Sequence, residues 1–161
     1  MPSPLPPTAA VTTTLTATKA LSTSEKTAAD AAVGLGDAIS ILKMIVGLNV
    51  NANGSATSMG QLLAADYDQD GSIGLSDAIG VLKHVVGLAA PEVKVAFVKN
   101  SAIPTELSFD SYNKSDAYGK ASTNKPSTSG WVSNPITIDP TQTTSVELVG
   151  FLTGDVDGSW Q

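Results

Sequence analysis

The chain has 161 residues, of which 42% are hydrophobic, and it carries a formal net charge of −6. All nine basic residues are lysine, and the absence of arginine, with the acidic balance, excludes nucleic acid as a partner because phosphates need basic clusters. With no cysteine and one histidine, the chain lacks the parts of a thiolate metal site or a catalytic triad, and we expect no enzyme activity.

Residues 1–27 are rich in proline, threonine, serine and alanine, and we interpret them as a leader or linker. Two readings of Val11–Thr16 stay open: a short strand, which its β-branched residues favour, and a flexible linker. The beginning of the chain lacks the basic and apolar segments of a standard signal peptide. No apolar run approaches the ~20 residues of a membrane span, so we expect none.

An internal repeat with an offset of forty residues organises the middle of the chain. The segment Asp30–Leu48 matches Asp70–Leu88, with about eleven of nineteen positions identical. Each copy has aliphatic residues at helical spacing and ends in Gly-Leu, a common helix end. We predict two amphipathic helices, packed as an antiparallel pair, that bury these stripes against each other. The stripe residues are Leu35, Ile39, Leu42 and Val46 in the first copy and Leu75, Ile79, Leu82 and Val86 in the second.

The segment Asp66–Asp77 fits the twelve-residue loop with which EF-hand-type proteins bind calcium. Calcium takes six to eight oxygen ligands at about 2.3–2.6 Å. Gly71 at position 6 permits the sharp turn, and Ile73 at position 8 is expected to point into the core. The predicted ligands are the carboxylates at positions 1, 3, 5 and 12 and the carbonyl at position 7, from Asp66, Asp68, Asp70, Asp77 and Ser72.

The corresponding loop of the first copy is degraded. With Asp37 at position 12, it has Lys26 and Ala28 at positions 1 and 3 and keeps an aspartate only at position 5. The segment 154–160, Gly-Asp-Val-Asp-Gly-Ser-Trp, begins like another calcium loop. We hypothesise that this segment completes a second Ca²⁺ site, within one chain or between chains; the alternatives are a metal-free first loop and a solvated acidic tail. The ligands of this second site would be Asp30, the Ala32 carbonyl, Asp37, Asp155, Asp157 and Ser159.

The repeat resembles a bacterial dockerin domain, in which a calcium loop followed by one helix occurs twice. The match covers roughly Asp30–Leu88, and a Gly-Asp-Val-Asp-Gly-Ser-Trp ending is similar to that of secreted bacterial proteins with dockerin-like repeats. The resemblance implies calcium-dependent docking to a cohesin-type partner. The chain departs from it at positions 10 and 11, where cellulosomal dockerins often have a hydroxyl pair and this sequence has Leu35-Gly36 and Leu75-Ser76. The matching residues are Asp66, Asp68, Asp70, Gly71, Asp77, Leu82, Lys83 and Gly87.

After Pro91, short segments of alternating apolar and polar residues predict strands, separated by polar loops over 111–130. The predicted fold is therefore α+β: a leader over 1–27, a dockerin-type repeat pair over 28–90, and a small antiparallel β region over 91–161 that ends in the calcium half-loop. We predict a bacterial calcium-binding attachment module, located outside the cell or on its surface. The alternatives are a self-assembling subunit of a calcium-dependent surface fibre or layer, and the C-terminal region of a secreted adhesin or enzyme.

Overall fold

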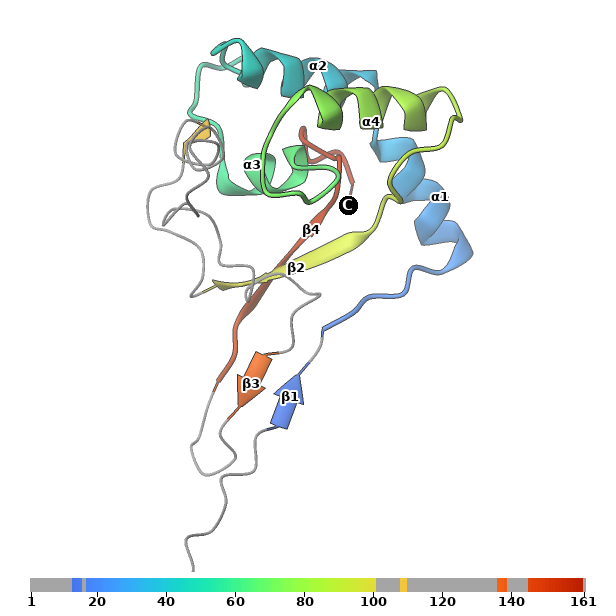
Figure 1. The fold of residues 1–161 in the computed structure, drawn as a ribbon, viewed down its shortest axis with the longest axis vertical. Coiled ribbons are helices and arrows are strands. Elements are labelled where there is room, and N and C mark those ends of the chain that lie inside the picture. Colours follow the sequence, from blue (N-terminus) through green and yellow to red (C-terminus); the bar gives the residue numbers. More distant parts are fainter. Residues whose placement is uncertain (1–12, 16, 101–107, 110–135, 139–144, 161) are drawn as a thin grey trace, which may run out of the picture.

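The computed structural model describes residues 13–15, 17–100, 108–109, 136–138 and 145–160. In this part the chain forms four helices and two two-stranded antiparallel sheets, a small α+β fold (Figure 1). None of the described helices reaches the length and apolar character that a membrane crossing requires. The proline-rich start of the predicted leader and all of the loops predicted over 111–130 lie outside the described residues.

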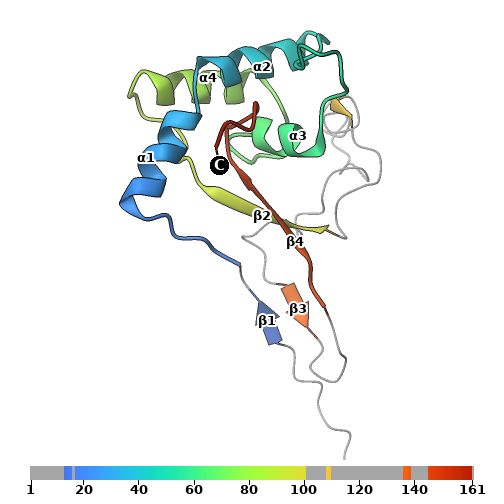
Figure 2. The same cartoon turned by 180° about the vertical axis from the view of Figure 1, so that it is seen from behind.

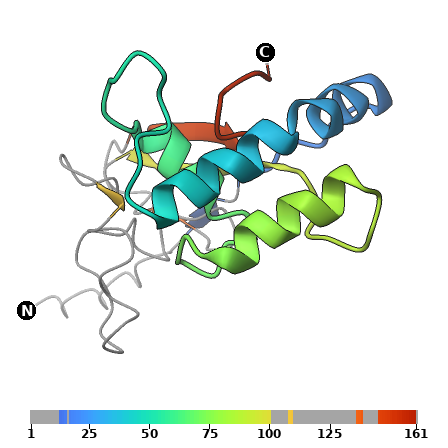
Figure 3. The same ribbon diagram turned by 90° about the horizontal axis from the view of Figure 1, so that it is seen from above.

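The two repeat copies form helices α2 (Leu35–Ile45) and α4 (Leu75–Val85), as predicted. They pack side by side and run in opposite directions (Figure 3). Each is followed by a glycine with a positive φ, 74° at Gly47 and 71° at Gly87, a conformation that glycine adopts without a steric penalty. The repeat in the sequence is therefore a repeat in the local structure.

The prediction of which face of the two helices is buried is wrong. The stripe residues are exposed, from 37% at Leu42 to 68% at Val46, apart from Leu82, which is partly buried. The buried face carries Asp37 and Asp77 in the first turns. Because residues four apart share a helix face, turning these aspartates inward buries the residues that follow them at helical spacing. Besides the aspartates, the buried residues on α2 are Ala38, Ile41 and Met44, and those on α4 are Ala78, Gly80 and Val81.

Helix α1 (Thr23–Ala32) was not predicted, and it occupies the end of the segment interpreted as a leader. The Ser22 side chain accepts the Glu25 N–H at 3.3 Å, and the Glu25 carboxylate accepts the Ser22 N–H at 2.9 Å. This reciprocal capping stabilises a helix start. Ala29 is fully buried, and Nε2 of His84 on α4 lies 3.1 Å from the Asp30 carbonyl oxygen. The helix is therefore part of the packed fold.

Helix α3 (Met59–Ala65) lies between the two repeat helices in the sequence. Ser58 and Gln61 form the same reciprocal cap as at α1. The last four residues of α3, from Leu62 to Ala65, are all buried, and the chain passes from them directly into Asp66. The helix therefore holds the start of the 66–77 loop in the core.

The strands pair in two separate ladders. Strand β1 (Thr13–Leu15) pairs antiparallel with β3 (Ile136–Ile138), which agrees with the strand reading of Val11–Thr16. Strand β2 (Val95–Lys99) pairs antiparallel with β4 (Leu148–Leu152). Strand β4 leads the C-terminal segment from the sheet to the space beneath α2 and α4, as Figures 1 and 2 show.

The C-terminal segment 153–160 is embedded in the fold. The N–H of Gly154 donates to the Ala64 carbonyl at 2.9 Å, and Thr153 and Val156 are 0% and 1% exposed. Near its end, the ammonium group of Lys19 lies 5.0 Å from the centroid of the Trp160 ring, within the range of a cation–π contact. The segment joins α3 and the residues before α1 to the core.

We expect Gly154→Ala to lower the free energy of unfolding by about 2–5 kcal/mol, because a left-handed non-glycine residue costs about 1–2 kcal/mol and an overpacked core about 1–3 kcal/mol. The φ of Gly154 is +87°, and an added Cβ would lie 3.0 Å from Tyr67 and Val33 atoms. Gly47→Ala is the matched control, since its φ is +74° with no neighbour within 4 Å. Urea unfolding of both variants measures the difference, and equal losses would contradict the packing argument.

Candidate metal centres

The loop Asp66–Asp77 brings three carboxylates together. Oxygens of Asp66, Asp68 and Asp70 lie within 4.8 Å of one another. Asp66 is fully buried, whereas the other two are exposed. The N–H of Gly71 donates to Oδ2 of Asp66 at 3.0 Å, so the turn at position 6 folds back onto the residue at position 1. Ile73 at position 8 is 2% exposed, in agreement with its predicted place in the core.

Asp77 closes this loop from the first turn of α4. Its Oδ1 accepts the Asp68 N–H at 3.2 Å, and its Oδ2 accepts the Gly74 N–H at 2.8 Å. The side chain is fully buried. The carboxylate at position 12 is thereby fixed by both halves of the loop, and the start of α4 depends on the same contacts. The remaining predicted ligand, the carbonyl of Ser72, belongs to the same loop.

The second group of carboxylates unites Asp37 with the C-terminal segment. Oxygens of Asp37, Asp155 and Asp157 lie within 4.8 Å of one another. Oδ1 of Asp37 accepts the Val156 N–H at 2.7 Å and the Asp157 N–H at 3.1 Å. The hydroxyl of Ser159 lies 3.2 Å from the Ala32 carbonyl oxygen. One chain supplies both halves of this group, which is the intramolecular form of the hypothesis.

The two groups repeat each other contact by contact. Gly34 N–H donates to Asp37 at 2.8 Å, as Gly74 N–H does to Asp77. Two further pairs of contacts match. The Trp160 N–H donates to Asp155 at 3.1 Å, as the Gly71 N–H donates to Asp66 at 3.0 Å. The Ser159 N–H donates to Asp157, as the Asp70 N–H donates to Asp68, both at 3.0 Å. The C-terminal segment therefore takes the place of positions 1–5 of a loop whose last half precedes α2.

Two features of this correspondence were missed by sequence reasoning. Tyr67 and Val156, each between two aspartates, are both 1% exposed and anchor their half-loops in the core. The next turn needs a positive φ, which is 60° at Gln69 and 71° at Gly158. Aligning 155–159 with 66–70 would have revealed both features. The alternative of a solvated acidic tail does not describe a segment that is buried at Val156.

Asp30, a predicted ligand, is not in either carboxylate group of the described residues. It lies in α1, where Oδ1 is 3.4 Å from Nζ of Lys26. We call the loop that is divided between the C-terminal segment and the start of α2 the split loop. Ser159 takes its position 5. The prediction aligned the first loop along a contiguous chain, whereas the structure has these residues in a helix.

Burial opposes ionisation of the two carboxylates at position 12. Desolvation raises the pKa of Asp77 to about 6, and it raises the pKa of Asp37 above its ordinary value. Backbone N–H donors from Gly74 and Gly34 partly offset this effect, whereas the charges of Asp68 and Asp157 add to it. A divalent cation would reverse the balance, because its charge stabilises the ionised carboxylates.

In the absence of divalent cations, we expect the protein to lose stability as the pH rises from about 4 to about 6. The pKa of the Asp77 carboxyl is 3.8 ordinarily and about 6 in the fold. The folded state therefore binds the proton more tightly than the unfolded state does, and this stabilisation is lost as the pH rises from about 4 through about 6. At about 1.4 kcal/mol per pKa unit, the loss is about 3 kcal/mol. Urea unfolding with chelator against pH measures it. Asp77→Asn should flatten the profile, and an unchanged profile in that variant would contradict the assignment.

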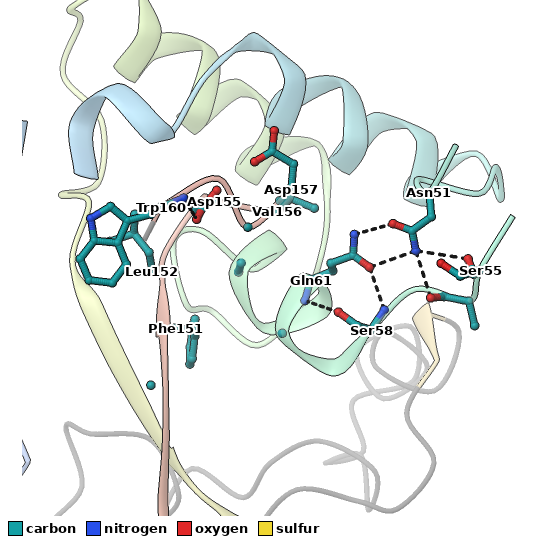
Figure 4. Close-up of a pocket in the computed structure, with 15 residues that line it drawn as sticks. Asn51, Ser55, Ser58, Gln61, Phe151, Leu152, Asp155, Val156, Asp157 and Trp160 are labelled. Atoms are coloured by element: carbon teal, nitrogen blue, oxygen red, sulfur yellow. Dashed lines mark hydrogen bonds between the residues drawn. The ribbon is translucent and has the colours of Figure 1, made fainter. Parts of the chain in front are cut away.

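A pocket of about 580 Å³ lies beside the C-terminal segment and α3 (Figure 4). Asp155 and Asp157 lie along one wall, and the opposite wall holds Asn51 and Gln61. The amides of Asn51 and Gln61 bond to each other at 2.8 and 3.2 Å. They therefore hold the 49–58 connection against α3.

No protein-family model, curated protein or solved structure matches this chain.

Proposed function

We propose that this chain is an extracellular, dockerin-like module of bacterial origin that binds two Ca²⁺ ions and attaches to another protein. The proposal is supported by the two equivalent carboxylate groups at the starts of α2 and α4, with Asp37 and Asp77 at corresponding places. The sequence resemblance to dockerins, two loop–helix units in tandem, points to the same function. We propose no catalytic activity.

Calcium is the ion that these groups favour. They offer only oxygen ligands, and each combines carboxylates with a candidate carbonyl, at Ala32 or Ser72, the mixture that calcium accepts. Mg²⁺ keeps several of its waters and is seldom held by a protein loop alone. Zinc would need nitrogen or sulfur ligands. We assign Asp66, Asp68, Asp70, Asp77 and the Ser72 carbonyl to one ion, and Asp37, Asp155, Asp157, Ser159 and the Ala32 carbonyl to the other.

The attachment surface is the outer side of the α2–α4 pair. Its exposed aliphatic residues are unusual on a protein surface, where contiguous apolar patches mark contact sites. Calcium would act at a distance from this surface, by fixing the first turns of both helices through Asp37 and Asp77. A folded, calcium-loaded pair would then present the surface in one rigid arrangement.

Calorimetric titration of the metal-free protein tests the calcium part of the proposal. We expect two Ca²⁺ per chain and much weaker binding of Mg²⁺. Absence of calcium binding would refute the proposed function. For attachment, an immobilised cohesin module is the first probe. Binding with calcium, and its loss with chelator or with Ile39→Lys plus Ile79→Lys, would support the expectation from the resemblance.

A further inference from the structure

Seven exposed aliphatic residues belong to α2, α4 and their C-cap positions, and we call them the helix-pair face. They are the predicted stripe residues without Leu82, and their exposed fractions run from 37% to 68%. In Figure 3, the view from above, no other described segment crosses over α2 and α4. The face consists of Leu35, Ile39, Leu42, Val46, Leu75, Ile79 and Val86.

The face has an internal two-fold symmetry. Helices α2 and α4 are equivalent and antiparallel (Figure 3), so a rotation of 180° about the normal to the pair exchanges them. Exposed fractions agree at three of the four equivalent pairs: 56% and 60% at Leu35 and Leu75, 45% and 42% at Ile39 and Ile79, and 68% and 66% at Val46 and Val86. The exception is Leu42, which is 37% exposed whereas Leu82 is partly buried. An apolar surface that repeats itself in this way can meet a copy of itself without mismatched groups. Dimers with two-fold symmetry use one self-complementary patch of this kind.

The charges of the chain favour contact on this side. The only acidic residues over 35–46 and 75–86 are Asp37 and Asp77, which are 1% and 0% exposed and lie on the opposite side of the helices. Lys43 and Lys83 flank the face at equivalent positions. Two chains of net charge −6 repel each other least where they bring no carboxylates together. Charge depletion at the centre of an interface is typical of protein–protein contacts.

The size of the face limits the affinity. Each helix has 11 residues and is about 16 Å long at about 1.5 Å per residue. Two neighbouring helices are about 20 Å across, given interaxial distances of about 8–10 Å. Each face is therefore about 320 Å² in outline, and pairing two copies covers roughly 640 Å² in outline, less than a standard specific interface. We therefore expect a reversible dimer with a dissociation constant no tighter than micromolar.

We propose that the partner of the helix-pair face is a second copy of this chain. Two copies pack α2 and α4 against their counterparts around a two-fold axis in the plane of the face, giving a four-helix contact. This inference rests on the proposed function, since it names the partner of the same surface.

Sedimentation equilibrium of the calcium-loaded protein tests the proposal. We expect a monomer–dimer equilibrium with a micromolar constant, weakened at least a hundredfold by Ile39→Lys plus Ile79→Lys, which place four added charges in the dimer contact. Ser24→Lys plus Ala28→Lys is the matched control, with the same charge change on exposed residues of α1. The control should dimerise as the original chain does, and both variants should still bind two Ca²⁺.

The chain has no cysteine among the described residues or elsewhere, so one spin label can be placed without background. A label at Ser40→Cys on α2 should give a single short distance between copies, and one at Ser24→Cys a longer one. A chain that stays monomeric at high concentration while binding two Ca²⁺ overturns the dimer and leaves the calcium function intact. The dimer proposal is also overturned if Ile39→Lys plus Ile79→Lys still dimerises, or if the chain stays monomeric and binds only the cohesin module.

Discussion

Removal of calcium is expected to lower the midpoint of thermal unfolding by about 10–20 °C. An ion present at a hundredfold excess over its dissociation constant stabilises the fold by about 2.7 kcal/mol, so two sites contribute about 5 kcal/mol. For a chain of this size, each kcal/mol shifts the midpoint by about 2–4 °C. We expect the ions to act at the buried carboxylates of Asp37 and Asp77, whose ionised forms a divalent cation would stabilise.

Differential scanning calorimetry in excess Ca²⁺ and in excess chelator measures this shift. Excess Mg²⁺ is the control for ionic strength and for non-specific divalent binding, and it should restore little of the loss. Amide exchange should locate the effect, with protection lost first in the loop 66–77 and in the C-terminal segment 153–160. Identical midpoints with calcium and with chelator would remove the basis of the calcium assignment.

The double variant Asp155→Asn plus Asp157→Asn is expected to bind one Ca²⁺ instead of two and to unfold about 5–10 °C lower in calcium, half the full effect. An amide has nearly the shape of the carboxylate, so it leaves the packing of Val156 between the two residues unchanged. It removes the two charges that the split loop contributes. The remaining ion should occupy the contiguous loop with its original affinity.

Asp30→Asn is the matched control, because Asp30 was a predicted ligand and lies outside both carboxylate groups. It should keep two Ca²⁺ sites and lose no more stability than an exposed ion pair supplies, about 0.2–1 kcal/mol. Asp66→Asn plus Asp68→Asn is the reciprocal variant and should leave only the split site. A count of one Ca²⁺ in the original chain, unaltered by the Asp155 and Asp157 changes, would show that the split site binds no ion.

The spacing of residues was sufficient to predict the contiguous loop. Asp66, Asp68, Asp70 and Asp77 stand within twelve residues, and a chain that turns at Gly71 brings them together through local geometry alone. The two helices could be predicted for the same reason, since helical periodicity is a local property. For β2 and β4, the sequence predicted an antiparallel β region but not which strands pair. Pairing partners separated by about fifty residues leave no local signal of their register.

The tertiary structure decided which side of the helices is buried and how the first loop is completed. Hydrophobicity alone placed Leu35 and Ile39 in the core, but the inward turn of Asp37 buries Ala38 and Ile41 instead. The sequence alone predicted which carboxylates of the loop 66–77 come together, because the shape of a contiguous loop depends mainly on neighbours along the chain. The split centre joins residues about 120 positions apart, and only the packing of β4 and α3 brings the C-terminal segment to Asp37.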